Sequence, residues 1–349
     1  MLHGALALLA VAMSGPVANP DPASPRPIVI AHRGASGERP EHTLAAYDRA
    51  IDQGADVIEP DLVVTRDGVL VARHENEISG TTDVADHPEF AARRTTRTID
   101  GATVTGWFTE DFTLAELRIL RARERLPQLR PANARFDGLF AIPTFDEILQ
   151  LAAARSAETG RPIGVYPETK HPTYFDSIGL SHDAPLIDAL ERHGLNRAGA
   201  PVYVQSFEVG NLQRLRPRLR VTVVQLVAAE GAPADRPQLP YARMLTPAGL
   251  RDVARYADAI GPDKRLVLDP STLASTGLVA RAHDAGLKVH PWTMRAENYF
   301  LPARLRRGEA PGAHGDLAGE IDALLAEGVD GLFSDFPAIS AQRVRTHGG

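Results

Sequence analysis

Cysteine is absent from the 349 residues of the chain. Its absence excludes disulfide bonds, a thiol nucleophile, and any zinc or iron–sulfur site built on cysteine ligands. It leaves the compartment open, because proteins without cysteine occur on both sides of a membrane. The missing residue type therefore narrows the chemistry but not the location.

An excess of positive charge is also lacking. The net charge is -6 and the isoelectric point is about 6.1, which argues against a nucleic-acid partner. Lysine is nearly absent: of the 38 basic residues only Lys170, Lys264 and Lys288 are lysines. A small anionic substrate stays compatible with this balance, provided that local positive charge attracts it.

The chain also lacks an apolar run long enough to span a bilayer. The run Leu6–Met13 is too short for that and resembles the hydrophobic core of a secretory signal, with possible cleavage after Ala12 or Ala18. We therefore expect residues 1–27 to form a signal peptide and a disordered tail, and the protein to be secreted or periplasmic. The alternative is a disordered tail without a signal, because no Lys or Arg precedes the run.

From Ile28 onward, short apolar runs alternate with amphipathic helical patterns, which is typical of βα units and a parallel sheet. Eight predicted strands favour an α/β fold of the closed type, a (β/α)8 TIM barrel over residues 28–345. The predicted strands are Ile28–Ala31, Val57–Val64, Ile163–Glu168, Val202–Ser206, Val221–Leu226, Ala259–Gly261, Lys288–Trp292 and Gly331–Ser334. The predicted helices are Thr43–Gln53, Ala184–His193, Glu208–Leu215, Pro247–Tyr256, Leu273–Ala285 and Gly319–Glu327.

One region interrupts the alternation. Val69–Arg73 predicts an extra strand that forms a hairpin with the second strand, turning at Asp67-Gly68. The residues from about 76 to 140 are polar and rich in arginine and threonine. We expect them to form an insertion after this hairpin, with a helix near Leu114–Ala122.

Barrel enzymes place their functional groups at the carboxyl ends of the strands, so a functional site is expected at these ends. The first strand leads into His32-Arg33-Gly34, in which the arginine can bind an anion and the histidine can move a proton. The second strand contains Glu59 and Asp61, which point to the same face because side chains alternate along a strand. Two inward carboxylates among apolar residues favour a bound Mg²⁺ or Ca²⁺, the alternative being ion pairs with arginine.

Further polar residues follow neighbouring strand ends. His74 follows the extra strand, and Glu168 and Lys170 share a face at the end of the third strand. Glu168 would complete a metal site, and Lys170 could bind a phosphate oxygen. The later strand ends carry Gln205, Phe207, Trp292 and Asp335, which could shape a pocket for a polar alcohol, although packing is the simpler interpretation for the aromatic residues.

Long blocks of the sequence carry a resemblance to a known family. They are HRGASGERPEHTLAAY, GADVIEPDLVVTRDGVLVARHENEISGTTDVA, IGVYPETK, QSFE, IGPD, VHPWT and GLFSDFP. In this order they resemble the glycerophosphodiester phosphodiesterase family, in particular its longer periplasmic branch. That family has a (β/α)8 barrel with a subdomain inserted after the second strand hairpin.

The resemblance implies roles for the residues that match. His32 and His74 would be the acid/base pair, Arg33 and Lys170 would hold the phosphate, and Trp292 matches an aromatic residue near the glycerol site. The carboxylates Glu59, Asp61 and Glu168 would bind one divalent metal ion, Ca²⁺ or Mg²⁺. The family usually has leucine or glutamine between the first two ligands, where this chain has Pro60, so we expect a local bulge of the backbone.

The activity implied is metal-dependent hydrolysis of small glycerophosphodiesters to glycerol 3-phosphate and an alcohol, through a cyclic phosphate. The alternatives are phospholipase D-like cleavage of lysolipids or sphingomyelin, hydrolysis of polymeric glycerol phosphate such as teichoic acid, and binding of phosphodiesters without catalysis. The sequence leaves the head group, the native metal and the oligomeric state open.

Overall fold

A computed structural model describes residues 26–347 of the chain. The predicted signal peptide falls almost entirely on residues outside this range, so export stays a prediction. Among the described residues, no helix combines the length and the apolar character needed to cross a membrane.

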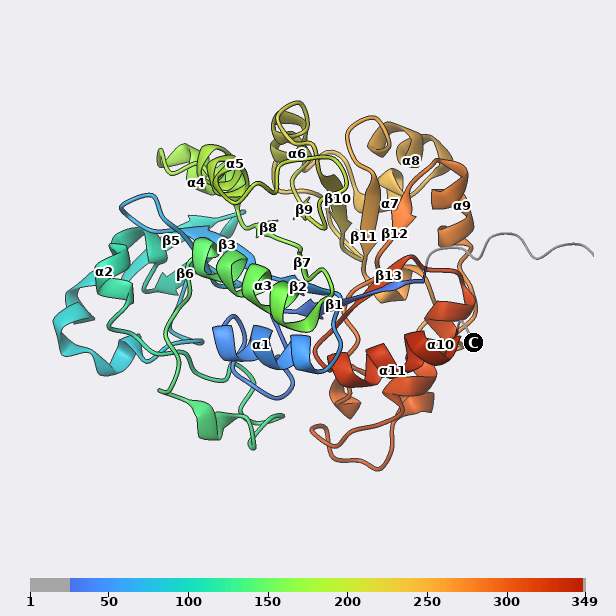
Figure 1. The fold of residues 1–349 in the computed structure, drawn as a ribbon, viewed down its shortest axis with the longest axis horizontal. Helices are drawn as coiled ribbons and strands as arrows, with labels where there is room; N and C mark the ends of the chain where they lie inside the picture. The colour runs from blue at the N-terminus through green and yellow to red at the C-terminus, as the bar shows by residue number, and fades with distance from the viewer. Residues whose placement is uncertain (1–25, 348–349) are drawn as a thin grey trace, which may run out of the picture.

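The described residues form a closed barrel of parallel strands (Figure 1). Hydrogen-bonded pairing follows chain order around the ring, and the last strand pairs with the first through Ile28–Gly331 to Ala31–Ser334. Backbone bonds from Phe333 N to Pro291 O (3.0 Å) and from Met294 N to Phe333 O (2.8 Å) join the last two strands. The predicted (β/α)8 fold is therefore confirmed. The barrel strands are β1 (Ile28–His32), β2 (Val57–Glu59), β3 (Asp61–Val64), β7 (Gly164–Val165), β8 (Glu168–Thr169), β9 (Tyr203–Ser206), β10 (Thr222–Val227), β11 (Ala259–Pro262), β12 (Lys288–Val289) and β13 (Gly331–Ser334).

Two prolines divide the second and third barrel strands. Pro60 separates β2 from β3, and Pro167 separates β7 from β8, because proline has no N–H to give to the strand ladder. The carbonyl groups of both prolines still accept hydrogen bonds, from Glu168 N (2.9 Å) and Gln205 N (3.0 Å) respectively. At Pro60, where a bulge was expected, the strand is interrupted, and the neighbouring strands remain joined across it.

Helices cover the outside of the barrel and bury their apolar faces on it. Thr43 caps α1 by accepting a hydrogen bond from Ala46 N, and Thr144 with Glu147 forms a capping box at the start of α3. The helices are α1 (Leu44–Asp52), α3 (Phe145–Thr159), α4 (Pro172–Ser177), α5 (Asp183–Arg192), α6 (Val209–Leu215), α7 (Tyr241–Met244), α8 (Pro247–Val253), α9 (Leu278–Asp284), α10 (Leu317–Ala326) and α11 (Pro337–His347), with short 3-10 turns at Lys264–Leu266, Asn298–Phe300 and Ala303–Leu305. Helices α3 and α11 were not among the predicted helices.

The segment 76–140 lies between the hairpin strand β4 (Leu70–Ala72) and helix α3, and in Figure 1 its elements occupy the left flank of the barrel. It contains a second hairpin, β5 (Thr95–Ile99) and β6 (Ala102–Gly106), the helix α2 (Leu114–Leu117), and 3-10 turns at Val84–Asp86, Pro88–Arg93, Thr109–Asp111 and Ala134–Phe136. The helix predicted near Leu114–Ala122 is shorter than expected: it ends at Leu117, and Ala122 forms a β-bridge with Thr82.

Candidate active site

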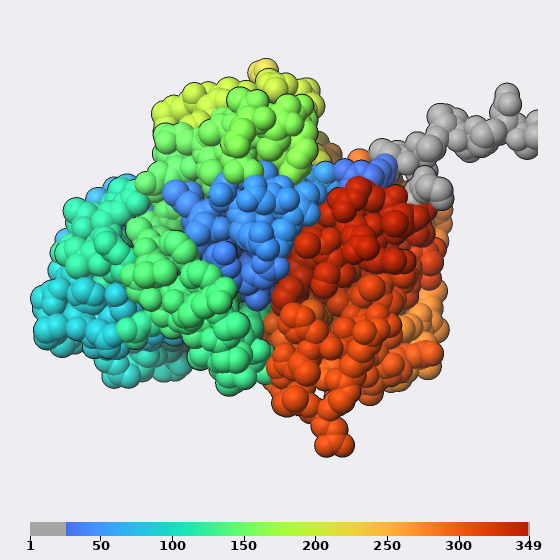
Figure 2. Space-filling view, turned by 60° about the horizontal axis from the view of Figure 1, so that its bottom comes forward, coloured from blue at the N-terminus to red at the C-terminus, as the bar shows by residue number. Residues whose placement is uncertain are grey.

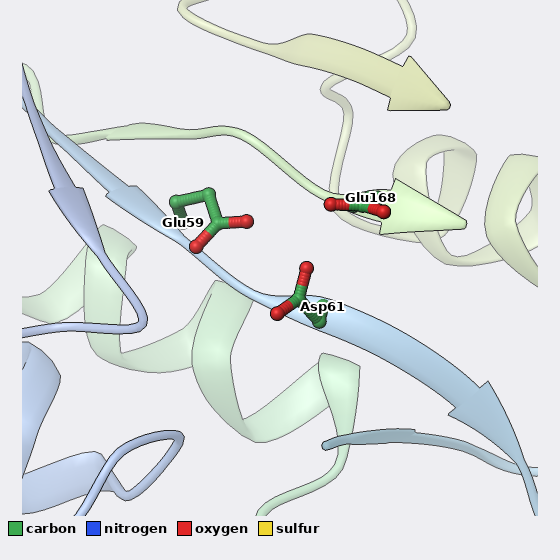
Figure 3. Close-up of side chains that lie close together, drawn as sticks. All are labelled: Glu59, Asp61 and Glu168. Atoms are coloured by element: carbon green, nitrogen blue, oxygen red, sulfur yellow. The ribbon is translucent and has the colours of Figure 1, made fainter. Parts of the chain in front are cut away.

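Three carboxylates meet at the carboxyl ends of the second and third barrel strands. Glu59 ends β2, Asp61 begins β3, and Glu168 begins β8, where it stands directly opposite Asp61 in the strand register. One carboxylate oxygen from each lies within 4.8 Å of the others, and Figure 3 shows the three groups turned toward a common space. The three residues predicted as metal ligands are therefore brought together.

Burial makes this cluster costly unless cations compensate it. Burial and the neighbouring carboxylates raise the pKa of Glu59 well above its ordinary value, and burial together with Asp61 raises the pKa of Glu168 to about 8. Asp61 behaves in the opposite way: against the effect of burial, Lys170 and Arg33 hold its pKa well below the usual range. Three oxygen donors in a buried cluster fit a hard divalent cation, so this site could hold a metal ion.

The two predicted phosphate-binding cations flank the carboxylates. Lys170 Nζ lies 3.0 Å from Glu168 Oε1, and Arg33 Nε lies 3.3 Å from Asp61 Oδ2. Although burial lowers the pKa of Lys170, the carboxylates of Glu168 and Asp61 raise it above its ordinary value. Arg33 also pairs with Glu41 at 3.2 Å. Both cations are thus held charged beside the triad.

His42 completes this shell, although nothing in the sequence pattern indicated a role for it within the first matching block. Its Nε2 lies 2.9 Å from Asp61 Oδ2, and its Nδ1 lies 2.8 Å from the hydroxyl of Tyr47. The side chain is fully buried. His42 therefore fixes the orientation of Asp61 from behind, and Gln205 does the same for Glu59 by donating to its Oε1 at 3.0 Å.

Each of the two predicted acid/base histidines has a carboxylate close to its Nδ1. His32 Nδ1 is hydrogen-bonded to Asp335 Oδ1 at 2.6 Å, and His74 Nδ1 lies 2.9 Å from Glu75 Oε1. Burial and Arg33 lower the pKa of His32 to about 4, while burial, Arg33 and Lys170 lower the pKa of His74 to about 3. Both imidazoles are therefore neutral at pH 7.

One cavity of about 830 Å³ connects these groups. His32, His74, Arg33, Glu59, Glu168, Lys170, Phe207 and Trp292 all line it, while Asp61 does not. Phe207 and Trp292 pack edge to face at 5.8 Å, and the indole of Trp292 donates to Gly261 O at 2.8 Å. Apolar and aromatic residues also line it, among them Leu268, Leu273, Tyr299, Phe300 and Leu301.

Comparison with known proteins decides the family. The model of the glycerophosphoryl diester phosphodiesterase family matches residues 32–339. The chain belongs to this family. It is 36% identical to a glycerophosphodiester phosphodiesterase of Arabidopsis thaliana over 327 residues, covering 89% of this chain and 84% of that protein. It is 29% identical to a glycerophosphodiester phosphodiesterase of Haemophilus influenzae, covering 89% of this chain and 87% of that protein.

Solved structures share the fold at lower identity. A putative glycerophosphoryl diester phosphodiesterase from Silicibacter pomeroyi has a TM-score of 0.65 at 24% identity and covers 93% of this chain and 95% of its own. An Oleispira antarctica phosphodiesterase, solved in complex with the product sn-glycerol-3-phosphate, has a TM-score of 0.58 at 20% identity and covers 92% of this chain and 97% of its own. Both confirm the barrel of this family member.

The family blocks do not themselves reveal which residues orient the histidines. Asp335 was expected to help shape the alcohol pocket, but it lies 2.6 Å from His32 and is also bonded by Arg130 and Arg295. Arg130 lies in the predicted insertion, where the sequence pattern singled out no functional residue. Only the strand order could have indicated that Asp335 lies near His32, because Asp335 follows the strand that pairs with β1.

Proposed function

We propose that this family member hydrolyses glycerophosphodiesters to glycerol 3-phosphate and an alcohol. The observation that carries the proposal is one cavity lined by two neutral histidines, two buried cations and two carboxylates of the acidic triad. Neutral imidazoles can accept protons, and Arg33 and Lys170 can bind the phosphodiester anion between them.

The residues of the chain support cleavage in two steps. One histidine takes the proton of the substrate's glycerol 2-hydroxyl, whose oxygen forms a new bond to phosphorus while the bond from phosphorus to the leaving alcohol breaks. The other histidine, protonated once the phosphodiester is bound, donates its proton to that alcohol. Water then opens the resulting cyclic phosphate to glycerol 3-phosphate, with the proton transfers reversed.

Glu59, Asp61 and Glu168 are the residues that would hold a divalent metal ion, and all three offer oxygen. Ca²⁺ or Mg²⁺ suits this donor set, and when bound it would supply positive charge toward the phosphate oxygens. Arg33 and Lys170 add their own charge from either side, so phosphate binding is shared between side chains and ion.

A second candidate is phospholipase D-like cleavage of lysolipids. The observation that favours it is the presence of apolar side chains in the cavity lining, such as Leu268, Leu273 and Phe300. Elsewhere in the described range only four large apolar residues are exposed, Leu44, Ile119, Leu139 and Ile178. A water-soluble substrate is therefore the first choice, because an enzyme that works on a lipid surface needs a continuous apolar patch.

The test is release of glycerol 3-phosphate from glycerophosphocholine, measured with Ca²⁺, with Mg²⁺ and with EDTA. We expect metal-dependent release that falls by about 10²-fold or more in His32→Ala and in His74→Ala, the range of a general acid or base. His193→Ala is the matched control, because His193 also pairs with a carboxylate, Asp146 at 3.0 Å, but does not line the cavity. Choline release from micellar lysolipid without turnover of glycerophosphocholine would favour the second candidate, and near-normal activity in either site variant would refute the assignment.

A further inference from the structure

His74 is the first member of a series of polar contacts that leads away from the cavity. Glu75 Oε1 lies 2.9 Å from His74 Nδ1, and Glu75 Oε2 is hydrogen-bonded to His171 Nε2 at 2.8 Å. His171 Nδ1 in turn bonds Asp100 Oδ2 at 2.6 Å. With a carboxylate at each nitrogen, His171 is held as a cation, and these partners raise its pKa to about 9 against the effect of burial.

Asp100, the last residue of this series of contacts, lies at the tip of the hairpin β5–β6 in the segment 76–140. Ile99 pairs with Ala102, so Asp100 and Gly101 form a two-residue turn in which both have positive φ, 49° and 82°. This is the geometry for which Asp-Gly is preferred. His171 also has a φ of 49°, which is uncommon for a residue other than glycine. The hydrogen bond between His171 and Asp100 therefore joins two residues with uncommon backbone conformations.

His32 is held in a similar way, from a different part of the same segment. Asp335 bonds His32 Nδ1 with Oδ1, and with Oδ2 it accepts from Arg130 Nη2 at 2.5 Å. Arg130 also donates to Glu297 Oε1 at 2.5 Å and to Ser36 O at 2.9 Å. Its side chain is only 4% exposed, so these bonds lie away from solvent. Figure 2 shows the green end of the segment 76–140 against the orange C-terminal third of the chain, the region that contains Glu297.

We propose that the segment 76–140 positions both histidines of the active site, His74 through Asp100, His171 and Glu75, and His32 through Arg130 and Asp335. The inference rests on the proposed function, in which these histidines move the protons. Asp100, His171 and Arg130 are positioning residues, since each acts through another group and not on the substrate.

The contacts through Glu75, His171 and Asp100 form one arm, and those through Asp335 and Arg130 form the other. The physical effect of both arms is to select one tautomer and one orientation of the histidine ring. A carboxylate at Nδ1 accepts the Nδ1–H of a neutral imidazole, so the lone pair is left on Nε2. Among residues 26–347 neither Nε2 has a hydrogen-bond partner, and both rings line the cavity. Loss of an arm lets the ring rotate or change tautomer, which should lower kcat and leave substrate binding nearly unchanged.

The two arms differ in strength. Glu75 is 47% exposed and Asp100 is 31% exposed, whereas Asp335 and Arg130 are 1% and 4% exposed. Solvent weakens exposed pairs, so the arm through Glu75 and Asp100 should contribute less to kcat than the arm through Asp335 and Arg130. Since a general acid or base contributes about 10²–10⁴-fold, we expect kcat to fall about 10-fold in His171→Gln and Asp100→Asn, and about 10²-fold in Arg130→Lys. Lysine cannot reach both carboxylates with one ammonium group as the planar guanidinium does.

The experiment compares these three variants with His32→Ala and His74→Ala on two substrates, glycerophosphocholine and the p-nitrophenyl ester of glycerol phosphate. p-Nitrophenolate leaves without a proton, so any variant that impairs only the general acid recovers on the ester. We expect His171→Gln and Asp100→Asn to share the leaving-group dependence of His74→Ala, and Arg130→Lys to share that of His32→Ala. A merely structural role would not divide the variants in this way.

Controls separate the possible failures. His193→Gln and Arg155→Gln remove comparable pairs, with Asp146 and Asp48, outside the cavity, and should keep wild-type kcat. Inactivity of the wild-type protein on both substrates would refute the proposed function itself. Wild-type kcat in both His171→Gln and Asp100→Asn, or a rise in KM alone, would overturn the inference while the function stands. If Arg130→Lys fails to fold, His171→Gln and Asp100→Asn decide the outcome.

Discussion

Without metal, the Glu168→Gln variant should be at least as stable as the wild type, whereas in calcium it should be less stable. The pKa of Glu168 is raised to about 8, above its ordinary value of 4.5, so the folded state binds a proton that the unfolded state releases between these values. The stability from this proton is complete below pH 4.5 and is lost as the pH rises toward 8. Glutamine cannot ionise and does not suffer this loss, so at pH 7.5 in EDTA the variant should be at least as stable as the wild type.

Calcium should change this order. A ligand that binds only the folded state at 100 times its Kd adds about 2.7 kcal/mol to the free energy of unfolding. For a domain of this size 1 kcal/mol corresponds to about 2 °C, so the wild-type Tm should rise by about 5 °C. If the loss of one ligand weakens binding about 100-fold, the same calcium concentration adds only about 0.4 kcal/mol, or roughly 1 °C.

The assay is thermal unfolding at pH 7.5 of the wild type, Glu168→Gln and the control Glu158→Gln, each in EDTA and in Ca²⁺. Glu158 is 67% exposed on α3 and should behave as wild type. A full calcium shift in Glu168→Gln would refute the triad as the metal site. The absence of any wild-type shift with either Ca²⁺ or Mg²⁺ would refute metal binding to the folded protein.

Three further predictions concern the helix start, the first loop and the protons of the site. Thr144→Ala removes the capping box with Glu147 and should lower the free energy of unfolding by about 1 kcal/mol in urea titration, with kcat unchanged. Gly34→Ala should cost more, about 2–3 kcal/mol in the same titration, because its φ is +89° and a Cβ would lie 2.6 Å from the backbone of α1. Binding of a non-cleavable glycerophosphonate at pH 7 should take up protons at His32 or His74, measurable by calorimetry in buffers of different ionisation enthalpy, and an absence of uptake would contradict the assignment of a protonated acid in the complex.

The alternation of apolar runs and helical patterns predicted the barrel because each barrel strand is buried on both faces. The hairpin β5–β6 was not predicted, although it carries the same Asp-Gly signal that identified the turn at Asp67-Gly68. Five of the ten residues of its strands are exposed threonines, so the strands lack the alternation that marks a half-buried strand. Helix α3 had a visible start in Thr144 and Glu147, but it follows the irregular segment and not a barrel strand.

The candidate site was predictable as far as local strand geometry reaches. Glu59, Asp61, Glu168 and Lys170 meet because alternating side chains at the carboxyl ends of adjacent strands share one face. The contact of His32 with Asp335 spans 303 positions and needs two further facts, that β13 closes on β1 and that Ala31 pairs with Ser334. No periodicity encodes the contacts made by the segment 76–140, because irregular chain is placed by tertiary contacts alone.

In the proposed mechanism, the charge around the histidines would link substrate binding to catalysis. Burial together with Arg33 lowers the pKa of both His32 and His74, and Lys170 lowers that of His74 further, so both rings are neutral before substrate arrives. A bound phosphodiester would bring a negative charge beside the same two cations and offset their effect on the rings, which would raise both pKa values. The acid would then be formed only in the presence of the anion whose leaving group it serves, while the ring that remains neutral would act as the base. In this way Arg33 and Lys170 can both bind the phosphate and help to keep the two histidines neutral until the phosphodiester is bound.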